Sequence, residues 1–456
     1  MSATHIMANG TLVPGGSVPS VIPDGAVAWQ GDRILEIGES SAVKDRFPEA
    51  RILDAGGGLI LPGLINTHHH FYSAMARGLD PGTPMTTFPE VLDRLWWRLD
   101  RALDPETIRT SALLSAADCI RWGCTTVFDH HASPGCIEGS LDLIAEALGA
   151  AGISGALCYE VTDRNGHDGA LAGIEENLRF FRERRNDPRI RGVFGIHASF
   201  TVLDETLGHI ADRRPKEAGC HIHLAEDPVD AEASVAAFGV DPLVRLEQAG
   251  LLDERALLAH GIHLTESDLR TVARTGAALI HNPESNANNG VGRLDVPRVS
   301  ALGCRVGLGT DGMSSAMLRA LRFAFLNLRG AEKDPTAGFE VLPSLLGENS
   351  AVARTFFEEP LLGELAPGAP ADLIAVDSPP PTPIEEDNLL GHMVYGAAEA
   401  PVRHTVARGR VLLEEFEHTT LDPTQLAEEA RSLAPGLWQR FHSLDWGTAY
   451  LGTEAR

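Results

Sequence analysis

From residue 59 onward, short apolar segments alternate with longer segments that have the periodicity of helices. An apolar run that is too short for a helix is typical of a strand buried on both faces. Repeated strand–helix units predict an α/β fold, and about eight of them match a (β/α)8 TIM-like barrel of ordinary size. The expected strands are Leu59–Asn66, Thr125–His130, Ser154–Val161, Gly192–Ala198, Gly219–Leu224, Ala256–Gly261, Ala277–His281 and Arg305–Gly309.

The segments between these strands carry helix signals. In one of them Asp104 precedes Pro105, which fits an N-cap followed by the first helical position. A doubly wound open sheet would show the same alternation, but it would place a glycine-rich phosphate turn after an early strand. None follows Leu59–Asn66, so we favour the barrel. The expected helices include Pro105–Trp122, Gly139–Ala151, Gly169–Arg185, Asp241–Ala249 and Glu266–Thr275.

The two ends of the chain have a different sequence pattern from the central part. Residues 1–58 contain short alternating segments such as Gly25–Gln30 and Arg33–Ile37, and similar segments recur at 364–420. We expect both ends to form one small β-sandwich domain beside a barrel at 59–363, followed by a helical tail at 421–456. The chain has 456 residues, more than one core usually supports, which agrees with this division.

Charge and cysteine content exclude several classes of function. The formal net charge of -25 disfavours nucleic acid as a partner, because phosphate binding needs a basic face. The six cysteines are scattered without a CxxC pair, which is typical of reduced thiols in a cytoplasmic protein. The sequence shows no signal-peptide pattern and no apolar run long enough to cross a bilayer, so we expect a cytoplasmic protein with no membrane partner.

Residues that commonly bind metals follow several of the expected strands, at the end of a barrel where active sites are built. Along a strand, alternate side chains share a face, so His68 and His70 point the same way and His69 points away. Each such residue alone has an ordinary interpretation, but their recurrence at separate strand ends favours one zinc or iron(II) site. The set is His68 and His70, then His223 and Glu226, then His260, and finally Asp311.

Four motifs, PGLINTHHHFY, HIHLAED, LLAHG and LGTDG, resemble those of the amidohydrolase superfamily, in its mononuclear metal-dependent branch of deaminases and triazine chlorohydrolases. Three further stretches, LWWRLDRALD, DHHASP and HNPESNANN, resemble SsnA-type aminohydrolases, and HHHFY also resembles 8-oxoguanine deaminases. The resemblance covers nearly the whole chain, including the split β domain. It implies a hydrolase acting on carbon–nitrogen bonds other than peptide bonds, and relatives of this kind commonly form dimers.

By that resemblance, one divalent metal would be bound by His68, His70, His223 and Asp311, with zinc favoured and iron as the alternative. A water molecule on the metal would attack the substrate and release ammonia. Asp311 would take the proton of this water, Glu226 would protonate a ring nitrogen, and His260 would hydrogen-bond the water. The expected fourth strand lacks the lysine that bridges two metals in binuclear relatives, so we expect one metal.

Substrate contacts are harder to assign. The aromatic residues Phe71, Tyr72 and Trp97 could line a pocket for a flat heterocycle, although packing of the barrel rim would explain them equally well. Polar residues near other strand ends could contact ring nitrogens or carbonyls, and these are His130, Glu160, His197 and Asn282. Histidines at the rim favour a polar, nitrogen-rich substrate.

The resulting prediction is a deaminase of an amino-substituted N-heterocycle, with a guanine- or 8-oxoguanine-like purine favoured. A triazine-type chlorohydrolase or a cyclic-amide hydrolase is the alternative. A non-catalytic scaffold is more remote, because all the matched ligands and Glu226 are present.

Overall fold

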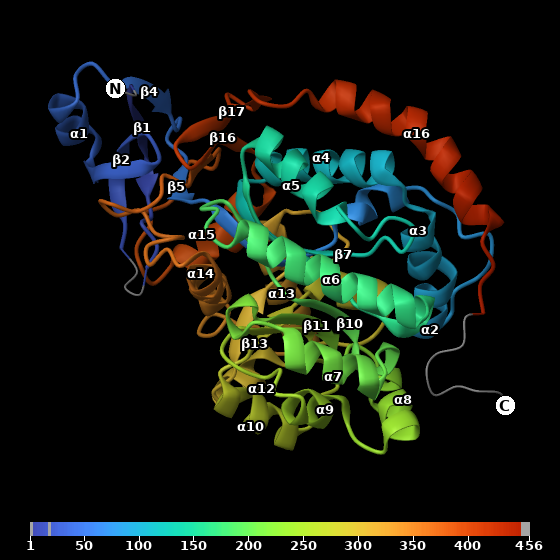
Figure 1. The fold of residues 1–456 in the computed structure, drawn as a ribbon. Helices are drawn as coiled ribbons and strands as arrows, with labels where there is room; N and C mark the ends of the chain where they lie inside the picture. The colour runs from blue at the N-terminus through green and yellow to red at the C-terminus, as the bar shows by residue number, and fades with distance from the viewer. Residues whose placement is uncertain (1–2, 17–19, 448–456) are drawn as a thin grey trace.

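The computed structural model describes residues 3–16 and 20–447. Within these residues, strands from both ends of the chain form one mixed sheet in the order β18-β17-β16-β15-β5-β1-β2-β3, with β4 paired to β1. Figure 1 shows the N-terminal strands of this sheet, in blue, at one side of the molecule. The strands are β1 (Thr4–Leu12), β2 (Ile22–Gln30), β3 (Arg33–Glu39), β4 (Arg51–Asp54), β5 (Leu59–Pro62), β15 (Leu373–Val376), β16 (Val402–Ala407), β17 (Arg410–Glu414) and β18 (Glu417–His418).

The expected single strand Leu59–Asn66 is two strands. Its first part, β5, pairs with β1 and β15 in the mixed sheet, and its second part begins a parallel sheet as β6 (Leu64–His69). The chain crosses between the sheets at Gly63, where a Cβ atom would lie 2.3 Å from Oγ1 of Thr125. Only glycine permits this close approach, so the apolar run is interrupted there.

Two parallel sheets make up the central part of the described chain, in the orders β6-β7-β8-β9 and β10-β11-β12-β13-β14. Parallel bridges join the two sheets at His69–Asp311 and at Val161–Ile196. The expected strand Gly192–Ala198 is divided between them. Besides β6, the strands are β7 (Cys124–His131), β8 (Ser154–Tyr159), β9 (Ile190–Gly192), β10 (Gly195–Ala198), β11 (Cys220–Leu224), β12 (Ala256–His260), β13 (Ala278–His281) and β14 (Arg305–Leu308).

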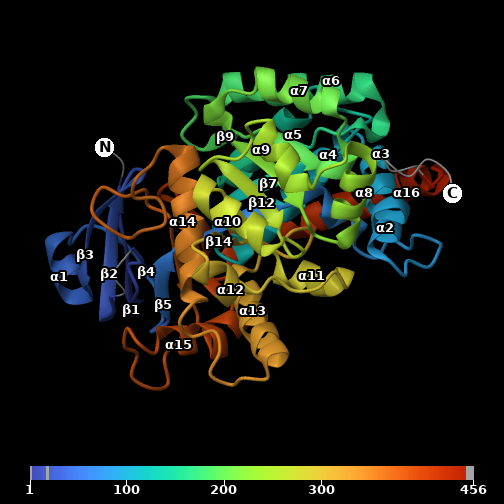
Figure 2. The same cartoon turned by 90° about the horizontal axis from the view of Figure 1, so that it is seen from below.

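Helices follow the parallel strands and cover their outer side (Figures 1 and 2). The expected cap is present, because the Asp104 side chain accepts a hydrogen bond from Thr107 N at 2.9 Å and Pro105 begins α4. The helices are α1 (Ser40–Arg46), α2 (Phe88–Val91), α3 (Trp97–Ala102), α4 (Pro105–Arg121), α5 (Ser140–Ala151), α6 (His167–Arg184), α7 (Asp204–Arg213), α8 (Pro228–Phe238), α9 (Pro242–Gln248), α10 (Glu266–Thr275), α11 (Pro283–Asn289), α12 (Val296–Ala301), α13 (Met317–Glu332), α14 (Pro343–Phe357), α15 (Leu389–Tyr395) and α16 (Pro423–Ser443).

Helix α14 packs against one end of the parallel strands, between them and the mixed sheet (Figure 2). Its residues Val352, Phe356 and Phe357 share one apolar cluster with residues of both parallel sheets, such as Phe128 of β7 and Leu257 of β12. Its Asn349 side chain hydrogen-bonds the backbone of Leu308 and of Ile65. Side chains of α14 therefore fill this end of the parallel strands, and the carboxyl ends of the strands lie at the other end.

The C-terminal helix α16 runs along the outside of α4 and α3 (Figure 1). Among the described residues, no helix is both long and apolar enough to cross a membrane.

The division of the chain into domains at residues 58, 363 and 420 stays a prediction, and so does the β-sandwich. The last part of the expected tail, residues 448–456, lies outside the described residues.

Candidate metal centre and active site

Residues that are far apart in the sequence meet at the carboxyl ends of the parallel strands. Ligand atoms of His68, His223, His260 and Asp311 all lie within 4.8 Å of one another. Nε2 of His70 is 2.9 Å from Oδ1 of Asp311 and 3.1 Å from Nε2 of His223. His69 points away from this cluster, and its Nδ1 is 2.6 Å from the backbone oxygen of Asp311. The structure thus gathers the side chains that the sequence analysis selected.

The hydrogen bonds of these histidines indicate which ring nitrogens are left to bind a cation. Nδ1 of His70 lies 2.5 Å from the carbonyl oxygen of His130, and Nδ1 of His223 lies 2.9 Å from that of His197. A carbonyl only accepts, so we assign a hydrogen to each Nδ1, and in the neutral rings that bind metals each Nε2 then carries a lone pair. Nε2 of His68 is buried and has no hydrogen-bond partner among the described residues. Imidazole nitrogens of this kind, with a carboxylate beside them, are suitable ligands for a divalent metal.

The backbone is strained at three residues of this site. Ala225, His260 and Asp311 have φ values of 48°, 76° and 53°, in the left-handed region that residues with a Cβ rarely adopt. His260 is the last residue of β12, Ala225 follows β11 and precedes Glu226, and Asp311 lies in the turn after β14. Strained residues of this kind persist where the surrounding structure holds them, and they concentrate at functional sites.

Strand β14 comes unusually close to β6 beside the cluster. A Cβ atom at Gly309 would lie 2.4 Å from Oδ1 of Asn282 and 2.8 Å from Cβ of His68. A larger residue would push the two strands apart and would displace Asp311 from the histidines. Steric crowding therefore explains why a glycine, Gly309, stands two residues before Asp311.

Two supporting contacts of the cluster were missed by the sequence analysis. Nδ1 of His68 lies 2.8 Å from Nε2 of His221, and the Ser285 hydroxyl donates to Oδ2 of Asp311 at 2.5 Å. His221 shares a strand face with His223, so the alternation of side chains along β11 could have identified it. Ser285 has no comparable signal, because serine is common at helix starts.

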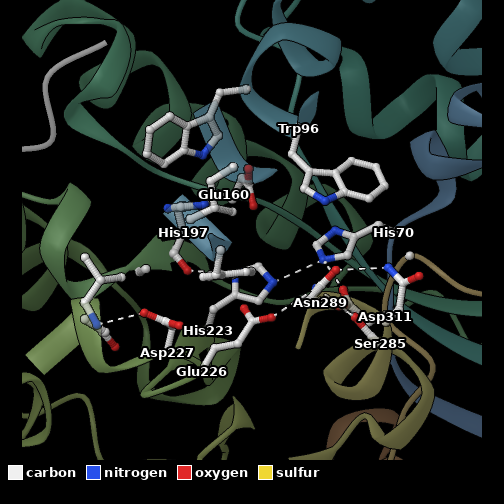
Figure 3. A pocket seen from close by; sticks show the side chains of 18 of the residues that line it. His70, Trp96, Glu160, His197, His223, Glu226, Asp227, Ser285, Asn289 and Asp311 are labelled. Carbon is white, nitrogen blue, oxygen red and sulfur yellow. Dashed lines mark hydrogen bonds and ion pairs between the residues drawn. The ribbon is translucent and has the colours of Figure 1, made fainter. Parts of the chain in front are cut away.

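Glu226 follows β11 and faces the same space as the cluster (Figure 3). Its Oε2 is 3.5 Å from Nε2 of His260, and Nδ2 of Asn289 donates to its Oε1 at 3.4 Å. Burial raises the pKa of Glu226 well above its usual value, and the charge of Asp311 raises it further. His260 is itself oriented by Asn286, whose Oδ1 is 2.8 Å from Nδ1 of His260.

A cavity of about 810 Å³, measured with its open mouth, lies directly above these residues. Figure 3 shows Glu226, His223 and Asp311 converging at its base, with Trp96 at its wall. Aromatic residues contribute much of the lining, and these are Tyr72, Phe88, Trp96, Trp97 and Phe200.

A second carboxylate, Glu160, lines the same cavity from the end of β8. Nδ1 of His130 is 3.1 Å from its Oε2, and Arg164 approaches its Oε1 at 3.4 Å. Burial acts to raise the pKa of Glu160, but His197, His130 and Arg164 together lower it below its usual value. The pocket therefore holds a fixed negative charge opposite Glu226.

Comparison of the sequence with known proteins identifies the family of this chain. The profile of the amidohydrolase family matches residues 59–412. The chain belongs to the amidohydrolase family. A curated relative from Pelotomaculum thermopropionicum, named 5-methylthioadenosine/S-adenosylhomocysteine deaminase, is 32% identical over 429 residues, which cover 92% of this chain and 95% of the relative. This amidohydrolase is a hydrolase of carbon–nitrogen bonds other than peptide bonds, as its relatives are.

Solved structures share the fold of this amidohydrolase. An adenosine deaminase from Xanthomonas campestris with bound zinc superposes with a TM-score of 0.82 at 23% identity, covering 97% of this chain and 99% of the other. An atrazine chlorohydrolase from Arthrobacter aurescens in complex with zinc superposes with a TM-score of 0.78 at 20% identity, covering 94% and 100%. Both proteins carry zinc, and the fold places a His and Asp cluster here.

Not every residue expected to contact substrate reaches the cavity of the amidohydrolase. Tyr72, Trp97, Glu160 and His197 line it. Phe71 packs in the apolar core instead, since a 3-10 turn begins at this residue and strand alternation no longer applies.

The two remaining candidates are buried behind the cavity wall. His130 contacts Glu160 and the backbone oxygen of His221. The Asn282 amide donates to Ile280 O at 3.3 Å. Neither residue lines the cavity.

Proposed function

We propose that this amidohydrolase is a metal-dependent hydrolytic deaminase that releases ammonia from an amino-substituted N-heterocycle. The observation that carries the proposal is the convergence of Glu226 with His68, His70, His223 and Asp311 at the base of one aromatic cavity. These four ligands would hold one divalent ion. Zinc is favoured over iron because the similar structures carry zinc. When bound, the ion supplies a Lewis acid that activates water near neutral pH.

The chain's own carboxyl groups would move the protons. Glu226, with its raised pKa, holds a proton that it can donate to a ring nitrogen, which makes the adjacent carbon accept water. Asp311 would take the proton of the attacking water, and Ser285 holds its second oxygen in place. His260 would hydrogen-bond the water and the oxygen that develops on the ring carbon, with Asn286 fixing its ring.

The cavity favours a flat substrate without a negative charge. Tyr72, Trp96 and Trp97 offer faces for stacking. The described residues that line the cavity include no lysine or arginine, whereas Glu160 and Glu226 contribute carboxyl groups. A phosphorylated compound would be repelled, so we favour a free base or a nucleoside.

Purine-like substrates fit this description best. Guanine and 8-oxoguanine are favoured by the HHHFY resemblance, and 5-methylthioadenosine and S-adenosylhomocysteine are the compounds in the names of the curated relatives. A triazine chlorohydrolase would use the same residues with chloride as the leaving group. Ring opening of a cyclic amide is less favoured, because strand β10 carries no lysine to bridge a second metal.

A screen for product release tests the proposal. Zinc-loaded protein is incubated with guanine, 8-oxoguanine, 5-methylthioadenosine, S-adenosylhomocysteine, a pterin and a chloro-triazine, and ammonia and chloride are measured. Ammonia from at least one purine, abolished in Glu226→Gln, supports the deaminase. Chloride release without ammonia would favour the chlorohydrolase. No turnover of any compound by protein that holds one metal per chain would favour the scaffold.

We also propose that the two parallel sheets close into one (β/α)8 barrel. The bridges His69–Asp311 and Val161–Ile196 and the apolar cluster shared by both sheets support it. We propose further that both ends of the chain form one β domain, that the protein is cytoplasmic, and that it forms a dimer. The six cysteines are free, which agrees with a reducing compartment.

A further inference from the structure

Three metal-binding side chains converge on the outer surface, away from the inner cluster. They are His167, the first residue of α6, and Glu205 and His209 of α7. One ligand atom of each lies within 4.8 Å of those of the other two, and the two imidazole rings have centroids 6.2 Å apart. Figures 1 and 2 both show α6 and α7 side by side on the outside of the parallel strands.

We propose that His167, Glu205 and His209 bind one zinc-class transition-metal ion at a second, exterior site. Two imidazole nitrogens and one carboxylate oxygen suit zinc, nickel or copper, whereas calcium and magnesium prefer oxygen ligands alone. Because His167 and Glu205 are exposed, water can complete the coordination. The argument for this site does not rest on the proposed deaminase activity.

The three side chains are free to bind an ion. No described residue in 3–16 or 20–447 hydrogen-bonds or ion-pairs with any of them, although neighbouring carboxylates are paired. Glu175 pairs with Arg213, and Asp204 pairs with Arg245 at 2.7 Å. The charge of Glu205 is therefore not neutralised by a neighbouring cation, and a metal ion would neutralise it.

The local structure holds the ligands in place before an ion arrives. Glu205 and His209 are four residues apart on one helix, so they share a face. Asp163, in the turn before α6, accepts hydrogen bonds from Leu203 N at 2.7 Å and from the Thr206 hydroxyl at 2.8 Å. This buried carboxylate ties the start of α6 to the start of α7, which reduces the ordering cost of binding.

Occupancy would also restrain part of the cavity wall. Arg164 follows Asp163 in the same turn, and its guanidinium carbon lies 4.6 Å from the ring centroid of Trp97. Trp97 lines the cavity. An ion that links His167 to α7 would therefore stiffen the turn that carries Arg164.

Titration with zinc chloride tests the site. Isothermal titration is performed on the wild-type protein and on Asp311→Asn, which weakens the inner site, so that the exterior event is seen by itself. His167→Ala and His209→Ala are then compared in both backgrounds. His392→Ala, at a partly exposed position of α15, is the control, and thermal unfolding without metal checks that each variant is folded.

We expect an exterior event that persists in Asp311→Asn and is unchanged by His392→Ala. His167→Ala and His209→Ala should each weaken it by about tenfold or more, because each removes a direct ligand. Zinc binding that is equal in these two variants and in the wild type would overturn the proposal. So would the absence of any binding event in Asp311→Asn.

Discussion

Nε2 of His70 lies 3.1 Å from Nε2 of His223, although the Nδ1 atoms of both rings face backbone carbonyl oxygens. With both rings neutral and the hydrogens on Nδ1, two lone pairs face each other in a buried site, which is unfavourable without a cation between them. Asp311 lies beside both nitrogens and supplies the negative charge that a divalent ion needs. The arrangement is thus one that a metal completes.

Removal of the carboxylate should release the metal. In Asp311→Asn we expect less than one retained metal per chain after dialysis against a mild chelator, and loss of activity. Ser285→Ala is the comparison variant, because it keeps the carboxylate and removes only the hydroxyl that donates to it at 2.5 Å. It should weaken metal binding by about 10–100-fold. Elemental analysis after dialysis against increasing chelator concentrations compares metal retention in the two variants, and full retention in Asp311→Asn would show that the turn after β14 supplies no ligand.

Glu226→Gln should separate metal binding from catalysis. The amide keeps the size of the side chain but cannot exchange a proton, so turnover should fall by about 10²–10⁴-fold while the metal remains. Glu232→Gln, at an exposed position of helix α8 that does not line the cavity, is the matched control. Near-normal turnover in Glu226→Gln would remove Glu226 from the proton path.

Asp230 should make the stability depend on pH in a defined direction. Burial raises its pKa from 3.8 to about 6, although Ala225 N donates to it. The folded state therefore keeps a proton that the unfolded state loses, so this contribution to stability decreases as the pH rises through the window from about 4 to about 6. Below this window the contribution is fully present, and above it the contribution is lost.

Asp230→Asn should abolish that dependence. The difference in melting temperature between the wild type and the variant should favour the wild type more at a pH of about 4 than at about 7. Comparing the two proteins at each pH cancels the titration of all other groups. A difference that is constant with pH, or that changes in the opposite direction, would contradict the raised pKa of Asp230.

Arg98 links the C-terminal helix to the cavity wall. Its side chain is 1% exposed, it donates to Phe441 O at 3.1 Å and to Pro81 O at 3.0 Å, and its guanidinium carbon lies 4.0 Å from the Phe441 ring centroid. Its neighbour Trp97 lines the cavity. The tail, for which the sequence suggests no function, therefore supports this wall.

Arg98→Met should lower the free energy of unfolding by about 3 kcal/mol, because buried carbonyl groups lose a charged donor. It should also raise KM more than it lowers kcat, since the change acts on the wall and not on the proton-transfer groups. Arg109→Met, at an exposed position of the adjacent helix α4, is the control and should change neither quantity. An unchanged melting temperature in Arg98→Met would contradict the role of this contact.

The candidate ligands could be predicted because they obey local rules. His68 and His70 share a face by strand alternation, and β11, β12 and β14 present His223, His260 and Asp311 at the same edge of parallel strands. The strand–helix alternation likewise depends on short-range patterns. Both are present in the structure, although two expected strands, Leu59–Asn66 and Gly192–Ala198, are each divided between two sheets.

Other features depend on contacts that a local pattern does not record. The apolar run from Leu59 has the same appearance whether it is one strand or two, and the division appears only in the pairing of its two parts with different sheets. Phe71 leaves the strand alternation because a 3-10 turn starts there. The contact between Arg98 and Phe441 joins residues separated by 343 positions, which no periodicity indicates.

An anomalous-scattering map, recorded at the zinc absorption edge from crystals grown without added zinc, tests the central claim most directly. We predict one strong peak within bonding distance of Nε2 of His68, His70 and His223 and of a carboxylate oxygen of Asp311. Protein loaded with iron should give the same peak at the iron edge. A map with no peak among these four side chains, from protein that elemental analysis shows to contain metal, would contradict the account.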